Sequence, residues 1–171
     1  HILTIKCRMN LLAQPEKSGR PGCIGCEEHQ QAALRAARKS ITLLKNDAHT
    51  LPLTSVRRVA VIGANADDIR AQYGDWTYFT HPGFQPDRPA VRPYGTIREG
   101  IEAIGAQENF EVVYHRGCGV LPSEDDNIPG AVAACRSADA IVLVVGDVYA
   151  QYGETKDRAD LALSGRQLAL Y

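Results

Sequence analysis

The chain has 171 residues, 44% of them hydrophobic and 23% charged, which is enough apolar material for one well-formed core. A formal net charge of -1 gives no electrostatic reason to expect nucleic acid or an anionic membrane as a partner. No apolar run approaches the roughly 20 residues that a membrane-spanning helix needs.

The ends of the sequence lie inside helical patterns. It starts at His1 without an initiator Met and stops at Tyr171. We therefore expect a piece of a longer protein, and the sequence leaves the compartment of that protein unknown.

The five cysteines are an odd number and are scattered along the chain, which does not indicate a disulfide framework. Cys23 and Cys26 have zinc-like spacing, with His29 close behind. A structural zinc site needs four ligands, and no second pair stands at the required spacing. We therefore expect neither a metal ion nor a cofactor.

The chain alternates helical and strand patterns. Helical spacing occurs at residues 2–12 and 27–40, with a linker rich in proline and glycine between them, and residues 41–44 predict a short strand. Further along, β-branched apolar runs predict strands at 56–62, 110–115 and 140–145, and helices are predicted at 68–73, 96–104 and 128–137. Strands separated by crossover helices indicate an α/β fold, with a mostly parallel sheet covered by helices on both faces.

Local signals refine two of these helices. Asn65 or Asp67 can cap the helix at 68–73. Thr96, with Glu99 three residues later, predicts a capping box for the next helix. The segment after Gly63 lacks the glycine spacing of a dinucleotide site, so we do not expect a nucleotide there.

The segment after the third predicted strand is the best candidate for a functional site. The run at 140–145 is apolar on both faces and ends at Gly146, which predicts a strand in the middle of the sheet. Polar and ionisable side chains follow at once: Asp147, Tyr149, Gln151, Tyr152, Glu154, Lys156, Asp157, Arg158 and Asp160. Open α/β sheets bind ligands at the carboxyl ends of their strands, so any chemistry is expected here.

Several blocks of sequence, in order, resemble the second domain of glycoside hydrolase family 3, and bacterial β-glucosidases in particular. The blocks are AARKSITLLKNDAHTLPL, VRRVAVIGANADD, QYGDW, TIREGIEA, VVYHRGCGV, ADAIVLVVGD and GETKDRADLALSGRQ. The resemblance implies that residues 33–171 form a three-layer α/β sandwich domain, truncated at its C-terminus. It also implies that residues 1–32 are the end of a preceding barrel domain and the linker between the domains.

The resemblance further implies a retaining, exo-acting β-glucosidase that hydrolyses terminal non-reducing β-D-glucosyl residues of glucosides or oligosaccharides. The family's nucleophilic Asp lies on the barrel, which this sequence lacks, so we expect the chain alone to be inactive. The general acid/base is in many members a Glu of the second domain, and GETKDRADL places Glu154 at that position. In a retaining enzyme this group protonates the leaving oxygen and then deprotonates water, with the nucleophile about 5 Å away.

Other residues of the site carry open alternatives. Asp147 is the rival acid/base, with capping of the turn as its other role. Trp76 and Tyr152 are candidate substrate-binding residues, although Trp76 could equally plug its loop onto the sheet. Because a general acid must keep its proton, we expect the cations Lys156 and Arg158 to point aside or to pair with two acidic neighbours, Asp157 and Asp160.

Two other functions stay open. The barrel sets most of the sugar preference, so a β-xylosidase or a broader exo-glycosidase of the same family is an alternative. A non-catalytic α/β binding domain is the alternative from another class. Glu154 and Trp76 at opposite ends of the sheet would favour it.

Overall fold

The computed structural model describes residues 1–13, 23–74, 77, 95–122 and 125–171, which form two compact units, His1–Thr50 and Leu51–Tyr171. The first unit holds α1 (Ile2–Arg8) and α2 (Glu27–Ser40). Helix α2 has acidic residues in its first turn and basic residues in its last, which suits the helix dipole. Residues 41–44 are irregular, so the strand predicted there is wrong. Short apolar runs do not become strands without a partner to pair with.

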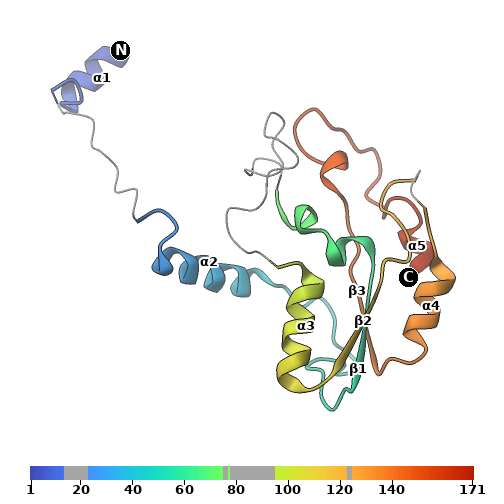
Figure 1. The fold of residues 1–171 in the computed structure, drawn as a ribbon. Helices are drawn as coiled ribbons and strands as arrows, with labels where there is room; N and C mark the ends of the chain where they lie inside the picture. The colour runs from blue at the N-terminus through green and yellow to red at the C-terminus, as the bar shows by residue number, and fades with distance from the viewer. Residues whose placement is uncertain (14–22, 75–76, 78–94, 123–124) are drawn as a thin grey trace. The chain divides into compact units, whose positions relative to one another are not determined.

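The second unit is built on a parallel sheet in the order β2-β1-β3 (Figure 1). β1 (Arg58–Ile62) lies between β2 (Glu111–His115) and β3 (Ala140–Leu143), and Val59 is in register with Val112 on one side and Ala140 on the other. The predicted α/β class and parallel sheet are confirmed.

Helices cover both faces of the sheet, with α3 (Ile97–Glu108) and α4 (Ile128–Cys135) on opposite sides (Figure 1). On one face Val59 and Val61 pack with Ile101 of α3. On the other face Ile62 packs with Ala131 of α4. Side chains alternate along a strand, so the unbroken apolar sequence of β1 supplies both cores.

The central strand is β1, and the prediction that the strand at 140–145 occupies the middle of the sheet is wrong for the described residues. β3 ends at Leu143 and lies at the edge, where Ile141 is 55% exposed. An apolar β-branched run fits an edge position as well as a central one, so composition alone could not separate the two.

The capping box of α3 is confirmed. The Thr96 N–H donates to Glu99 Oε2 at 2.7 Å, and the Glu99 N–H donates to Thr96 Oγ1 at 3.2 Å. The helix predicted at 68–73 is instead a 3₁₀ helix, Ile69–Gln72, whose N-cap is Asp68. Asn65 and Asp67 are not its caps because they belong to a separate 3₁₀ turn, Ala64–Asp67. Within the described residues, no helix is both long and apolar enough to cross a membrane.

Candidate functional site

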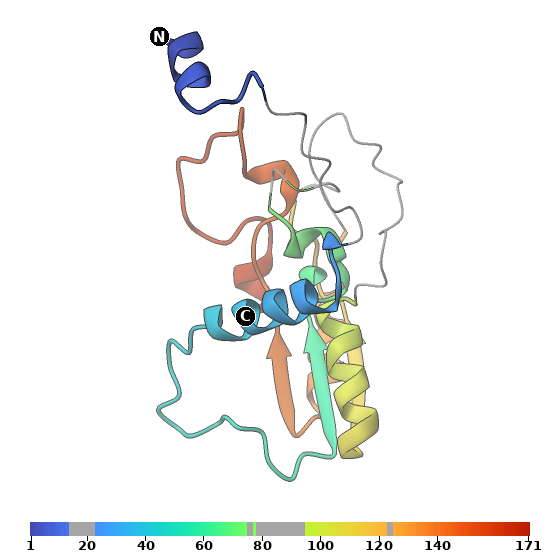
Figure 2. The same cartoon turned by 90° about the vertical axis from the view of Figure 1, so that its left-hand side faces the viewer.

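The carboxyl ends of β1 and β3 lie on the same side of the sheet, where several loops gather (Figure 2). The pairing continues one residue past the end of β3, since the Val144 N–H donates to the carbonyl of Ile62, the last residue of β1, at 2.8 Å. Gly63 has φ +116°, and a Cβ added to it would overlap the Val144 carbonyl oxygen. Only glycine allows the two chains to come this close.

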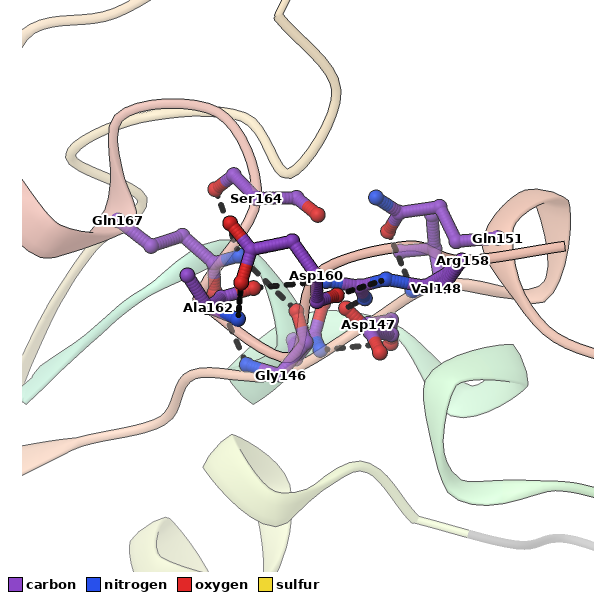
Figure 3. A network of polar contacts seen from close by, with 10 residues as sticks. Gly146, Asp147, Val148, Gln151, Arg158, Asp160, Ala162, Ser164 and Gln167 are labelled. Atoms are coloured by element: carbon purple, nitrogen blue, oxygen red, sulfur yellow. Dashed lines mark hydrogen bonds and ion pairs between the residues drawn. The ribbon is translucent and has the colours of Figure 1, made fainter.

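A long segment, residues 146–167, leaves β3 at this end and is called here the 146–167 loop. Apart from one short 3₁₀ helix, Tyr149–Gln151, it is irregular until α5 (Gln167–Leu170) begins. The loop is closed at its base by the side chain of Gln167, which is 3% exposed. Its Oε1 accepts the Gly146 N–H at 2.9 Å, and its Nε2 donates to the carbonyls of Gly146 and Ser164, each at 3.0 Å (Figure 3).

Arg158 cross-links the interior of the same loop (Figure 3). Its Nη1 pairs with the carboxylate of Asp147, while Nη2 donates to the Ala162 carbonyl at 2.7 Å and Nε to the Asp160 carbonyl at 3.1 Å. Arg158 therefore pairs with Asp147 and not with the carboxylate of Asp157 or Asp160, which was one of the two arrangements expected for it. The guanidinium reaches Asp147 because the loop folds back on its own first residues, and its planar fork can bind several oxygens at once.

Glu154, the predicted acid/base, is exposed on the outer part of the loop. It stands between Gly153 and Thr155, whose φ angles of +109° and +70° mark a tight turn. The Tyr152 hydroxyl donates to the Tyr73 carbonyl at 2.7 Å, which attaches this part of the loop to the segment that follows β1. Trp76 lies outside the described residues, so whether it shares one end of the sheet with Glu154 stays a prediction.

The other predicted residues have definite partners. Asp147 pairs with Arg158, and its backbone carbonyl accepts from the Asn65 side chain at 3.2 Å. Lys156 Nζ lies 3.4 Å from the centre of the Tyr149 ring and donates to the Tyr149 carbonyl, so its contacts are with Tyr149 and not with the carboxylate of Asp157 or Asp160. Asp147 thus takes part in the contacts that hold the loop, while its alternative role as acid/base and substrate binding by Tyr152 stay predictions.

A polar cavity of about 240 Å³ lies beside the base of the loop, at the carboxyl ends of β1 and β2. Its lining includes Asn65, Asp67, Tyr114, Arg116 and Val148. Burial is the main cause that raises the pKa of Tyr114, and the Asp67 carboxylate adds to it, so this phenol keeps its proton. Asn65 is 7% exposed, and its Oδ1 has no hydrogen-bond partner among the described residues.

The described residues contain no group of three or more His, Cys, Asp or Glu side chains placed to hold a metal ion. The polar side chains that line the cavity at the carboxyl end of the sheet include the amide of Asn65, the carboxylate of Asp67 and the hydroxyl of Tyr114. An exposed carboxylate on a tethered loop can exchange protons with a group brought to it from outside this chain.

Two residues that hold the loop were missed by sequence reasoning. Gln167 occurs in the last quoted block but was given no role, and Asn65 was considered only as a helix cap. A glutamine two residues after a Ser-Gly pair carries no local signal of burial. Its role depends on Gly146, which is 21 residues away in the sequence.

Comparison with known proteins places the chain in a class of carbohydrate-active enzymes. Residues 41–171 match the family model described as the glycosyl hydrolase family 3 C-terminal domain. The chain belongs to glycoside hydrolase family 3, and the resemblance seen in the sequence blocks is confirmed by a match over most of the chain.

Individual relatives are β-xylosidases and β-glucosidases. A β-xylosidase of Formosa agariphila is 37% identical over 99% of this chain and 23% of its own length. A β-glucosidase involved in saponin metabolism from intestinal bacteria has a TM-score of 0.67 and 36% identity over 85% of this chain and 22% of its own. An exo-β-xylosidase in complex with a xylobiose aziridine probe has a TM-score of 0.64 and 28% identity over 84% of this chain and 17% of its own. The chain thus spans about a fifth of the length of these relatives.

Proposed function

We propose that this chain is the acid/base-bearing part of a retaining, exo-acting β-glycosidase, with Glu154 as the general acid/base. The observation that carries the proposal is the placement of Glu154 in a family 3 C-terminal domain: an exposed carboxyl on a turn of a loop that side chains anchor to the carboxyl end of the sheet. A group in this position is accessible to a substrate held by another domain.

The chemistry needs two carboxyl groups. One protonates the leaving oxygen and later deprotonates water, while the other forms the glycosyl–enzyme intermediate. We propose that the second group, the nucleophilic Asp, belongs to a barrel domain in the N-terminal part of the longer protein. Docking of that domain over Glu154 would exclude water and favour the protonated acid before the first step.

The proposed substrates are β-linked glycosides with a free non-reducing end. Xylosides are the first to test, because the Formosa relative, matched over 99% of this chain, is a β-xylosidase. Terminal β-D-glucosyl residues are the second candidate, supported by the β-glucosidase whose structure is similar at a TM-score of 0.67.

The test is Glu154→Ala in the full-length protein, assayed on aryl β-xylosides and β-glucosides with a good or a poor leaving group. We expect a loss of about 10²–10⁴-fold on the poor leaving group, which needs protonation, and a much smaller loss on the good one. With the good leaving group, azide should speed the deglycosylation step by replacing the water that Glu154 would deprotonate, and it should yield a β-glycosyl azide.

Asp157→Ala is the matched control, because it removes an exposed carboxylate three residues along the same loop. We expect it to leave both rates near those of the unchanged protein. Equal losses on both leaving groups for Glu154→Ala, without azide rescue, would move the acid/base role to Asp147. An absence of any hydrolysis by the unchanged full-length protein would favour the non-catalytic binding domain.

A further inference from the structure

We propose that Gln167 is a positioning residue for Glu154, acting through the base of the 146–167 loop. The inference rests on the proposed role of Glu154 and extends it to a residue that does not touch the reacting atoms. It starts from the backbone of the loop, which has no sheet ladder to hold it and only one short 3₁₀ helix.

The Gln167 amide takes the place of a neighbouring strand. It pairs with both the N–H and the carbonyl of Gly146, as a peptide group of a paired strand would, and its second N–H holds Ser164. One buried side chain therefore joins the first residue of the loop to its last turn. Leaving these groups unpaired in a buried site would be costly, so the closed base is strongly preferred.

The clamp is coupled to both the sheet and the outer part of the loop. Asn65, which follows β1, holds the carbonyl of Asp147, the residue after Gly146. Arg158 then connects the Asp147 carboxylate to the backbone of Asp160 and Ala162. Glu154 lies on the segment between these two anchor points, four residues before Arg158. Its position relative to the sheet is therefore set by the clamp.

The inference predicts a specific kinetic signature for Gln167→Met, which keeps the size of the side chain and removes its three hydrogen bonds. In the full-length protein we expect a loss of about 10-fold to 100-fold on the poor leaving group, because displacement of a catalytic group by about 1 Å has effects of this order. The good leaving group should lose little. Exposed Gln107 on α3 provides the control substitution, Gln107→Met, which should change neither rate.

A double-variant comparison separates positioning from a general loss of structure. If Gln167 acts through Glu154, adding Gln167→Met to Glu154→Ala should cause no further loss on the poor leaving group. Losses that multiply, or Gln167→Met losses that are equal on both leaving groups, would overturn the inference. Arg158→Lys carries the same test if Gln167→Met does not fold, because it keeps a cation for Asp147 but loses the planar fork that spans Asp160 and Ala162.

A readout without catalysis distinguishes failure of this inference from failure of the proposed function. Trypsin can cut after Lys156 when the loop opens. Gln167→Met should speed this cut, and Gln107→Met should not. If Glu154→Ala shows no dependence on the leaving group, the proposed function fails, and the cleavage rate still decides whether Gln167 holds the loop. An unchanged cleavage rate in Gln167→Met would overturn the clamp itself.

Discussion

The two ends of the sheet are held by different means. At the amino end, one exposed carboxylate does the work: Asp139 Oδ2 accepts the N–H groups of Arg57 and Arg58 at 2.8 and 2.9 Å, just before β1 and β3 begin to pair. At the carboxyl end, the buried amides of Asn65 and Gln167 hold the backbone after β3. At the amino end a single side chain joins the starts of β1 and β3, whereas at the carboxyl end a network of side chains spans a long loop.

The difference follows from the connections at each end. At the amino end, only a few residues connect α4 to β3. Little more than the register between β1 and β3 has to be fixed there. At the carboxyl end, the 146–167 loop leaves the sheet for 20 residues or so before α5. Irregular backbone must find its hydrogen-bond partners among side chains. Side-chain hydrogen bonds therefore fix the backbone conformation at the same end of the sheet that bears the candidate site.

The largest loss of stability is expected from a substitution in the core that packs against the central strand. Ile62 is 2% exposed and packs with Ala60 and Ala131. Ile62→Ala should lower the free energy of unfolding by about 2–5 kcal/mol, because it leaves a cavity in the core between β1 and α4. Ile141→Ala is the control on edge strand β3, where the side chain is 55% exposed. Denaturant unfolding that gave equal losses for the two variants would contradict the central position of β1.

A smaller effect, confined to the carboxyl end, is expected for Gly63→Ala. The new Cβ would meet the Val144 carbonyl at a backbone φ of +116°, so β1 and β3 would have to separate where the loops begin. We expect a destabilisation of at least about 1–2 kcal/mol, measured by denaturant unfolding. Gly100→Ala on α3 is the matched control, since nothing lies within 4 Å of its added Cβ. That change should stabilise by about 0.5–1 kcal/mol, and a similar loss in both variants would rule out the close approach.

The sequence predicted the elements that depend on local pattern. The capping box at Thr96 was predictable because both of its partners lie within one helical turn. The strand at Arg58–Ile62 was predictable because its apolar run is buried on both faces, and the half-buried strand at Glu111–His115 was predictable from its β-branched and aromatic residues. The order of strands was not, since the apolar run of β3 suits the middle or the edge of a sheet equally.

In the candidate site, too, some features were predictable from the sequence and others were not. Glu154 could be proposed from a family resemblance, because its neighbours in sequence form a recognisable block. The pairing of Arg158 with Asp147 and the clamp made by Gln167 could not, because each depends on how the loop folds back over 11 and 21 residues. No local propensity determines where the loop folds back on itself. Only the folded chain shows which of several nearby acidic residues Arg158 contacts.

The smallest effect is expected at the amino end, from the titration of Asp139. Hydrogen bonds from the N–H groups of Arg57 and Arg58 hold the pKa of this carboxyl below its ordinary value of 3.8. Because the pKa is lower in the folded than in the unfolded chain, the ionised group stabilises the fold. This contribution is fully present above the ordinary value and is lost as the pH falls through the folded value. Asp139→Asn keeps an acceptor oxygen but does not titrate.

The Tm of the unchanged protein should therefore exceed that of Asp139→Asn at pH 7, and the difference should narrow as the pH falls below the ordinary value of 3.8. Added salt separates the two causes of the shift, since it screens the attraction of the Arg57 side chain but not the backbone hydrogen bonds. A Tm difference that persists in high salt supports the hydrogen bonds as the main cause. A difference that is constant with pH would show that the contact at the amino end does not depend on the charge of Asp139.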